Sequence, residues 1–174
     1  MSIPSRAEAA RILRAMDPPA WLAGHSAAVA DVAAFLASAI EQRGHAICVG
    51  LVEAAALLHD IDKPFPKDHP LKPLGHGYAG ATWARENGYD EIAGAIANHP
   101  VTRLADDDHY STWIRDAIVE ERVVAYADKR AKQDVVSLDD RFAYWIERHG
   151  KTPDIQKARQ RAEALEQEVL RSPS

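Results

Sequence analysis

An apolar run that ends directly on two ionisable side chains is the feature that most constrains this chain. Residues 54–58 read Ala-Ala-Ala-Leu-Leu, and His59 and Asp60 follow without a break. Such a run is typical of a core helix, so the imidazole and the carboxylate are carried toward the interior. A buried carboxylate without a partner costs several kcal/mol or is neutralised. A His-Asp pair also arises by chance in a chain of this size, but this context predicts a cation, with a metal ion as the obvious candidate.

Apolar residues recur at helical spacing along the rest of the chain, and Ser5 with Glu8 and Ser137 with Asp140 have the spacing of capping boxes. The proline-rich stretch 64–73 is expected to be a loop, and so is the polar stretch 101–110 with its run of aspartates. Helices are expected at residues 5–16, 20–42, 47–62, 76–87, 90–99, 111–128, 137–150 and 152–170, followed by a frayed tail. Because no alternating strand pattern is present, the chain is predicted to be all-α.

Composition limits the broad class of the protein. With 174 residues, 47% of them hydrophobic and 27% charged, the chain has the size of a single globular domain. Its net charge of -5 provides no basic field, so no long nucleic acid is expected as a partner. No run approaches the roughly 20 apolar residues of a membrane span, and the first residues lack a signal-peptide core. Cys48 is the single cysteine, so no internal disulfide forms, and a cytoplasmic location without membrane contact is expected.

Six metal-ligand side chains fall on inward-facing helix positions or at helix ends. They are His25, His59, Asp60, His76, His99 and Asp128. Imidazoles and carboxylates suit iron, manganese or zinc, and the absence of cysteine from the set argues against a structural zinc site. Two metal ions would use all six side chains. Read from its own helix alone, His25 fits a core histidine bonded to a backbone carbonyl equally well.

The order of these residues resembles the HD-domain superfamily of metal-dependent phosphohydrolases. The likeness spans about residues 21–141 and includes Ala-Leu-Leu-His59-Asp60-Ile-Asp-Lys63, Gly75-His76-x-x-x-Gly80-Ala81, Ala95-Ile96-Ala97-Asn98-His99 and Ala127-Asp128. It implies a single-domain HD helical bundle over 1–174, with a core at about 20–142, an N-terminal helix and a C-terminal helical extension. It also implies that His25, His59, Asp60 and Asp128 hold one metal, that His76 and His99 add a second, and that Asp60 bridges both.

The complete set of six is similar to the binuclear branches of that superfamily. These include small bacterial hydrolases of diadenosine tetraphosphate and the HD-GYP phosphodiesterases. The chain lacks the Gly-Tyr-Pro signature of the latter, and Gly77-Tyr78 does not replace it, so cyclic dinucleotides are not the expected substrate. Lys63 stands where similar mononuclear nucleotidases carry a glutamate, which points away from that branch.

The resemblance implies hydrolysis of a small nucleotide or related phosphate ester by a hydroxide that bridges two divalent ions, with iron or manganese preferred and Zn, Mg, Ni or Co as alternatives. Asp60 and Lys63 are the expected catalytic residues, with Lys63 supplying a positive charge to the phosphoryl group. Lys63, His69, Arg103 and Lys129 are the expected substrate contacts, although solvated helix ends explain Arg103 and Lys129 equally well. The four tryptophans are expected in the core, because three fall on apolar stripes.

Two other functions remain open at this point. A mixed-valent di-iron oxygenase of the same superfamily would use the same ligand order. A regulatory module that binds a nucleotide without turnover would keep the fold, but a complete ligand set argues against it. The expected partner is a small-molecule phosphate, and a homodimer is compatible with the sequence.

Overall fold

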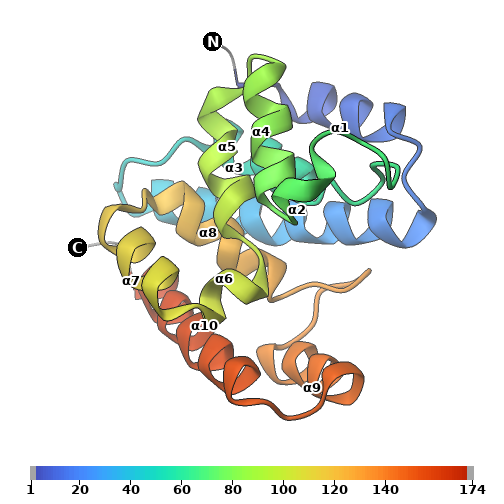
Figure 1. The fold of residues 1–174 in the computed structure, drawn as a ribbon. Coiled ribbons are helices and arrows are strands. Elements are labelled where there is room, and N and C mark those ends of the chain that lie inside the picture. Colours follow the sequence, from blue (N-terminus) through green and yellow to red (C-terminus); the bar gives the residue numbers. More distant parts are fainter. Residues whose placement is uncertain (1–2, 172–174) are drawn as a thin grey trace.

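The computed structural model describes residues 3–171, so the expected frayed tail at 172–174 lies outside the described residues. It confirms the all-α prediction: within these residues the chain forms helices and one isolated antiparallel bridge between Ala131 and Val135, and no strand. The elements, labelled in Figure 1, are α1 (Arg6–Ala15), α2 (Ala20–Gln42), α3 (Val49–Leu58), a 3-10 turn (Lys72–Leu74), α4 (Tyr78–Glu86), α5 (Asp90–Asn98), α6 (Val101–Ala105), α7 (Asp107–Asp116), α8 (Val119–Asp128), α9 (Leu138–His149) and α10 (Pro153–Arg171).

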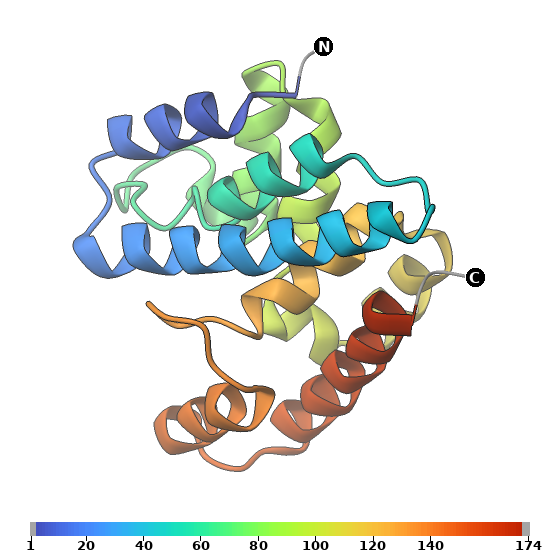
Figure 2. The same cartoon turned by 180° about the vertical axis from the view of Figure 1, so that it is seen from behind.

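Four helices, α2, α3, α5 and α8, pack on one another and form the centre of the domain (Figures 1 and 2). Their facing surfaces are rich in alanine; residues 54–56 of α3, for example, are completely buried. Small side chains let helix axes approach closely. The ends of these closely packed helices therefore also lie near one another. By length and apolar composition α2 could also cross a membrane, but half of its apolar window is buried inside the fold, as in a core helix.

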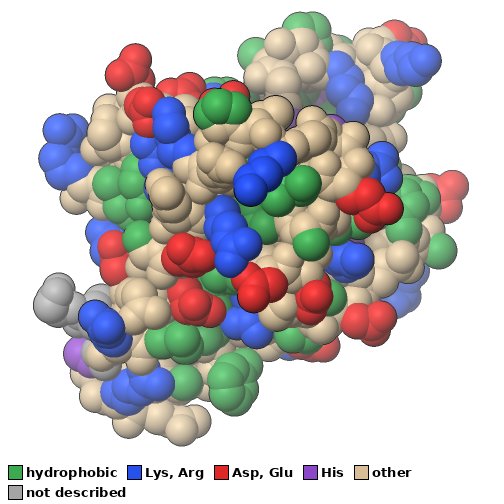
Figure 3. Space-filling view, turned by 90° about the horizontal axis from the view of Figure 1, so that it is seen from below, with side chains coloured by type: hydrophobic (Ala, Val, Ile, Leu, Met, Phe, Trp, Pro, Cys, Tyr) green, Lys and Arg blue, Asp and Glu red, His purple; other side chains and the backbone are tan. Residues whose placement is uncertain are grey.

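The remaining helices cover this centre. Helix α1 packs on α3, α4 on α5, and α10 on α6, α8 and α9. Ion pairs at the surface join α10 to its neighbours: Lys157 and Arg161 pair with Asp107, and Arg159 pairs with Asp139. Figure 3, which looks at this side of the molecule, shows basic and acidic side chains intermixed. Most cations on α10 therefore have a carboxylate close by.

Helix starts were predicted well where a side chain caps them. Ser5 and Ser137 accept hydrogen bonds from the backbone N–H groups of Glu8 and Asp140, at 3.2 and 3.0 Å, so both expected caps are confirmed. Helix α2 has the expected bounds. The expectation of a loop at 101–110 is wrong, because Asp106 accepts a hydrogen bond from the His109 N–H and starts α7. The aspartate run is thus a helix N-terminus, where acidic side chains are favourable.

Three helices are shorter than expected. The helix expected at 111–128 is broken near Ala117 and Ile118, both of which have extended backbone, into α7 and α8. The helix expected at 76–87 begins two residues late, because Gly77 has φ +84°. The helix expected at 47–62 ends at Leu58, and the chain continues in tight turns closed by bonds such as Lys63 N–H to the Asp60 carbonyl, 2.9 Å. In a regular helix these side chains would point in different directions around the axis. The tight turns bring them together in one place instead.

Candidate metal centre

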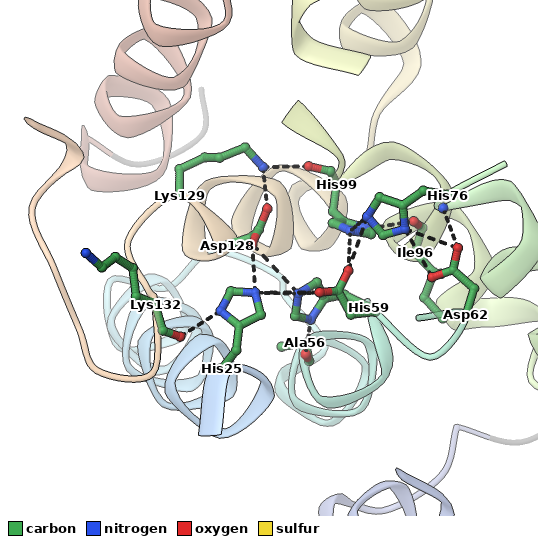
Figure 4. A network of polar contacts seen from close by, with 12 residues as sticks. His25, Ala56, His59, Asp62, His76, Ile96, His99, Asp128, Lys129 and Lys132 are labelled. Atoms are coloured by element: carbon green, nitrogen blue, oxygen red, sulfur yellow. Dashed lines mark hydrogen bonds and ion pairs between the residues drawn. The ribbon is translucent and has the colours of Figure 1, made fainter. Parts of the chain in front are cut away.

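The six predicted ligands lie close together near the ends of the central helices. Figure 4 labels all of them except Asp60. His25 lies on α2, His59 and Asp60 follow α3, His76 precedes α4, His99 follows α5, and Asp128 is the last residue of α8. Five of the six are buried, whereas the side chain of His76 is 32% exposed. The site is therefore a polar cluster enclosed by an apolar core, with one side open.

The ends of α3 and α5 use the same local arrangement. The Nδ1–H of His59 donates to the Ala56 carbonyl, and the Nδ1–H of His99 donates to the Ile96 carbonyl, both at 2.7 Å. Carbonyl groups in the last turn of a helix have no partner within the helix, so each histidine satisfies one of them. Since a carbonyl only accepts, the proton of each neutral ring must be on Nδ1. The Nε2 lone pair of each ring is then free to bind a metal.

The other two histidines are oriented in the same sense by different groups. The Nδ1–H of His25 donates to the Lys132 carbonyl at 2.7 Å, in the turn after α8. The Nδ1 of His76 lies 3.1 Å from both carboxylate oxygens of Asp62. Asp62 also accepts from the Gly77 N–H at 3.1 Å, and a Cβ at Gly77 would lie 2.8 Å from Pro100, so glycine is required for this approach. All four rings therefore present Nε2 to the same region.

The donor atoms form two groups that share one carboxylate. In the first group, the His25 Nε2 lies 3.1 Å from both the His59 Nε2 and Asp128 Oδ1, and Asp60 Oδ2 lies 3.6 Å from the His59 Nε2. In the second, Asp60 Oδ1 lies 3.2 Å from the His76 Nε2 and 3.3 Å from the His99 Nε2, and the two Nε2 atoms are 3.2 Å apart. The two oxygens of Asp60 thus face different groups.

These donor atoms fit divalent metal ions. Ligand bonds of about 2.0 to 2.4 Å put neighbouring donor atoms about 3 to 3.8 Å apart, which covers the separations in both groups. Two unprotonated Nε2 atoms cannot hydrogen-bond to each other, so their close approach requires a cation between them or an extra proton on one ring. Nitrogen and carboxylate oxygen together suit iron, manganese or zinc. The structure thus brings all six predicted ligands together in an arrangement that can hold metal.

The pKa values agree with a strongly coupled cluster. Burial lowers the pKa of His59 to about 3, so this ring stays neutral. Burial opposes the charge of Asp60 and Asp128, but the imidazoles and, for Asp128, the Lys129 ammonium hold both pKa values well below the usual range. Burial also opposes the charge of His76, yet Asp60 and Asp62 raise its pKa to about 9. A metal entering the second group would have to displace the proton of His76.

Lys129 occupies a different place from that expected of a substrate contact. Its side chain is completely buried, and its ammonium donates to Asp128 Oδ2 and to the His99 carbonyl, both at 2.6 Å. The ammonium is turned away from solvent and connects a ligand of the first group to the backbone of the second. An ammonium held in this way positions Asp128 and His99 rather than reaching for an anion.

The other expected substrate contacts are spread around the site. Lys63 is exposed and follows Asp60 by three residues, and its positive charge opposes protonation of His76, whose pKa it lowers. His69 stacks on Phe65, with ring centroids 4.1 Å apart, in the proline-rich loop. The Arg103 guanidinium lies 3.8 Å from the centroid of the Tyr78 ring. Of these three residues, Lys63 is the one whose charge acts on a metal-group ligand.

The structure adds Asp62 to the candidate functional residues, although it was not among the residues expected from the sequence. Its carboxylate is buried and orients His76, as the backbone carbonyls orient the other three rings. Carboxylates in this role commonly raise the basicity of a ligating histidine. The available signal was its position two residues after Asp60 in the His-Asp-Ile-Asp run.

Comparisons with known proteins agree with this geometry. Residues 22–133 match the family model of the HD domain. The chain is also 32% identical over 141 residues to an uncharacterized protein of Methanocaldococcus jannaschii, covering 76% of this chain and 80% of that protein. No solved structure matches the chain. The chain therefore belongs to the HD-domain family, whose members are in general metal-dependent phosphohydrolases.

Proposed function

We propose that this protein is a phosphohydrolase that holds two divalent metal ions, iron or manganese, and cleaves a small nucleotide or related phosphate ester. The observation that carries the proposal is the position of Asp60: each of its oxygens faces a separate pair of histidine Nε2 atoms. A carboxylate shared in this way suits two ions a few Å apart, the arrangement used in many phosphatases. The proposal places the protein in the cytoplasm.

Bound ions of this kind neutralise phosphoryl oxygens and lower the pKa of water so that a nucleophile is available at neutral pH. The chain itself supplies orientation and charge. The Nδ1–H bonds keep all four imidazoles in the tautomer that can bind metal, and the buried Lys129 ammonium fixes Asp128. Lys63 is the exposed cation beside the second group, so its ammonium can approach a phosphoryl oxygen and stabilise negative charge as the ester bond breaks.

The test is release of phosphate by protein loaded with manganese under strict anaerobiosis. Metal content is measured first, and a panel of nucleotides and simple phosphate esters is then supplied. Sustained release with about two ions per chain supports the proposal. Absence of release across the whole panel contradicts it, and turnover that requires O₂ and reduced iron identifies the di-iron oxygenase instead. Nucleotide binding without any turnover identifies a regulatory module.

A further inference from the structure

A pocket of about 520 Å³ opens beside the metal centre, where His25 and Lys132 line it. In Figure 4 these two residues lie at the end of the cluster opposite His76. The pocket lies between the N-terminal half of α2, the turn after α8, and α9. Its lining includes Trp21, His25, Lys132, Arg141, Tyr144 and Arg148. Volumes of this size accommodate small-molecule ligands. His25 is both a metal-group residue and a wall of the pocket, so the pocket adjoins the first group of donor atoms.

The pocket gathers positive charge in a protein whose net charge is -5. Arg141 and Arg148 lie on one face of α9, two turns apart, and Lys132 reaches the same place from the turn. Tyr144 lies among them: its hydroxyl accepts from Arg148 at 2.9 Å, and the Lys132 ammonium lies 4.7 Å from its ring centroid. These contacts hold the cations in place without neutralising them.

Lys132 and Arg148 differ from the cations of α10 in their lack of a carboxylate partner. No carboxylate in the described part of the chain lies within 4 Å of either of them, whereas Lys157, Arg159 and Arg161 all form ion pairs. Neighbouring like charges repel, and an anion placed between them removes the repulsion. The two cations are therefore available to a ligand.

Arg141 joins the pocket to the metal centre. One of its Nη atoms lies 3.7 Å from Asp128 Oδ1, and its guanidinium lies 4.2 Å from the ring centroid of Trp145. Its buried Nε has no hydrogen-bond partner among residues 3–171. A buried donor without a partner is costly, so the Arg141 guanidinium has hydrogen-bonding capacity that the described residues do not use.

Two of the three cations that line the pocket follow the part of the chain that matches the HD domain. The HD-domain match ends at residue 133, and Arg141, Tyr144 and Arg148 follow it. Trp21, which was expected in the core, is instead 49% exposed and forms part of the opposite wall. The HD-domain match thus contains the six metal-group residues and Lys132, and the segment after it supplies Arg141 and Arg148.

We propose that this pocket binds a second anionic group of the substrate, with Lys132, Arg141 and Arg148 as its contacts. The substrate class is then phosphate esters with at least two anionic groups, such as nucleoside diphosphates, rather than simple monoesters. This inference rests on the proposed function, since it places the scissile phosphoryl group at the metals. It adds a specificity determinant of which two contacts, Arg141 and Arg148, lie outside the HD-domain match.

The test compares AMP with the α,β-methylene analogue of ADP, which has an additional phosphoryl group and a non-hydrolysable bridge. Binding of each is measured by calorimetry on manganese-loaded protein after removal of free metal. The altered protein carries Lys132→Gln and Arg148→Gln, neither of which is a metal ligand; His25 is oriented by the Lys132 backbone carbonyl, which the substitution keeps. The matched control carries Arg11→Gln and Arg85→Gln, which remove two exposed charges elsewhere.

The unaltered protein and the control should bind the analogue at least about tenfold more tightly than AMP, as expected for one or two hydrogen bonds to a charged group. The Lys132→Gln/Arg148→Gln protein should lose most of that preference while metal content stays equal. No preference in the unaltered protein, or a preference that survives the double substitution, overturns the inference. If the protein hydrolyses monoesters but does not prefer the ADP analogue over AMP, the proposed function holds and the pocket inference fails. If the preference exists and is lost in the double variant, but no ester is turned over, the pocket inference holds and the proposed hydrolase activity is refuted.

Discussion

The two halves of the metal centre are built differently. In the first group, His25, His59, Asp128 and Asp60 are all buried, and backbone carbonyls orient both imidazoles. The second group, His76 and His99 with the other oxygen of Asp60, has one partly exposed ligand, and that ligand is oriented by the Asp62 side chain. A backbone carbonyl moves only together with the chain around it, whereas a single side chain can change its rotamer alone.

This difference indicates that the two halves will bind metal with different strength. An ion in the first group is surrounded by fixed, desolvated ligands, and one of its histidines, His59, is neutral at any working pH. An ion in the second group competes with a proton on His76 and with solvent at the open side. The second ion is therefore expected to exchange more readily.

The largest effect should come from Asp60→Ala, which removes the ligand common to both halves. Both ions should be weakened, and turnover should fall by at least about 10³-fold, because the metals supply several kcal/mol of transition-state stabilisation. Metal analysis and phosphate release check this, with Asp68→Ala as a control that removes an exposed carboxylate nearby. Loss of only one ion would show that Asp60 does not connect the two groups.

Lys129→Met removes the buried ammonium that contacts both halves of the metal centre, and so tests its role in holding them. The substitution leaves Asp128 as a buried carboxylate without its ammonium partner, and the free energy of unfolding of the chelated protein should fall by about 3 kcal/mol or more. Urea denaturation measures this, and Lys151→Met, at an exposed position, should change the value by less than about 0.5 kcal/mol. Equal stability of both variants would contradict the positioning role.

Lys63→Ala tests the charge beside the second half. The ammonium is needed most in the transition state, so kcat on a phosphate ester should fall by about 10²-fold while metal content stays intact. Steady-state kinetics with metal analysis provide the measurement. Lys67→Ala, an exposed lysine of the same loop, serves as the matched control. An unchanged kcat for Lys63→Ala would remove Lys63 from the catalytic residues.

Asp62→Asn should weaken the second ion alone. Loss of the charge that orients His76 should lower the affinity for the second ion by about 10- to 100-fold, as for other residues that orient a ligating histidine. The first ion should stay in place. Metal titration measures both affinities. His99→Ala, which deletes a ligand of the same half, provides the reference with about one ion per chain. If Asp62→Asn weakened the two ions equally, the halves would not be independent.

The mildest test changes only pH. Because the pKa of metal-free His76 is raised to about 9, the ring carries a proton below that pH, and the second ion must expel it. Apparent affinity for the second ion should therefore fall about tenfold for each unit that pH is lowered below 9, and level off above it. Calorimetry in two buffers of different ionisation enthalpy should detect the released proton. A second-ion affinity independent of pH from 7 to 9 would contradict this.

Much of the fold could be predicted from local signals. Ser5, Ser137 and the helical spacing of 20–42 marked elements that the structure contains, because caps and apolar stripes act within a few residues. Helix ends without such a signal were misplaced. The continuation from Leu58 to Asp62 and the break near Ala117 depend on contacts with other helices, which local spacing does not contain.

The sequence by itself determined the chemistry of the centre: four imidazoles and two carboxylates on the inward faces or at the ends of apolar helices, without cysteine. Their identity follows from side-chain type, and their inward direction from helical periodicity. Only the tertiary structure decided how they divide into two groups, because the partners of Asp60 come from helices far apart in the chain. It also decided the roles of Asp62, Lys129 and Arg141. A charged side chain becomes an orienting group, a buried support or a pocket wall according to what packs around it, and packing is set by the whole core.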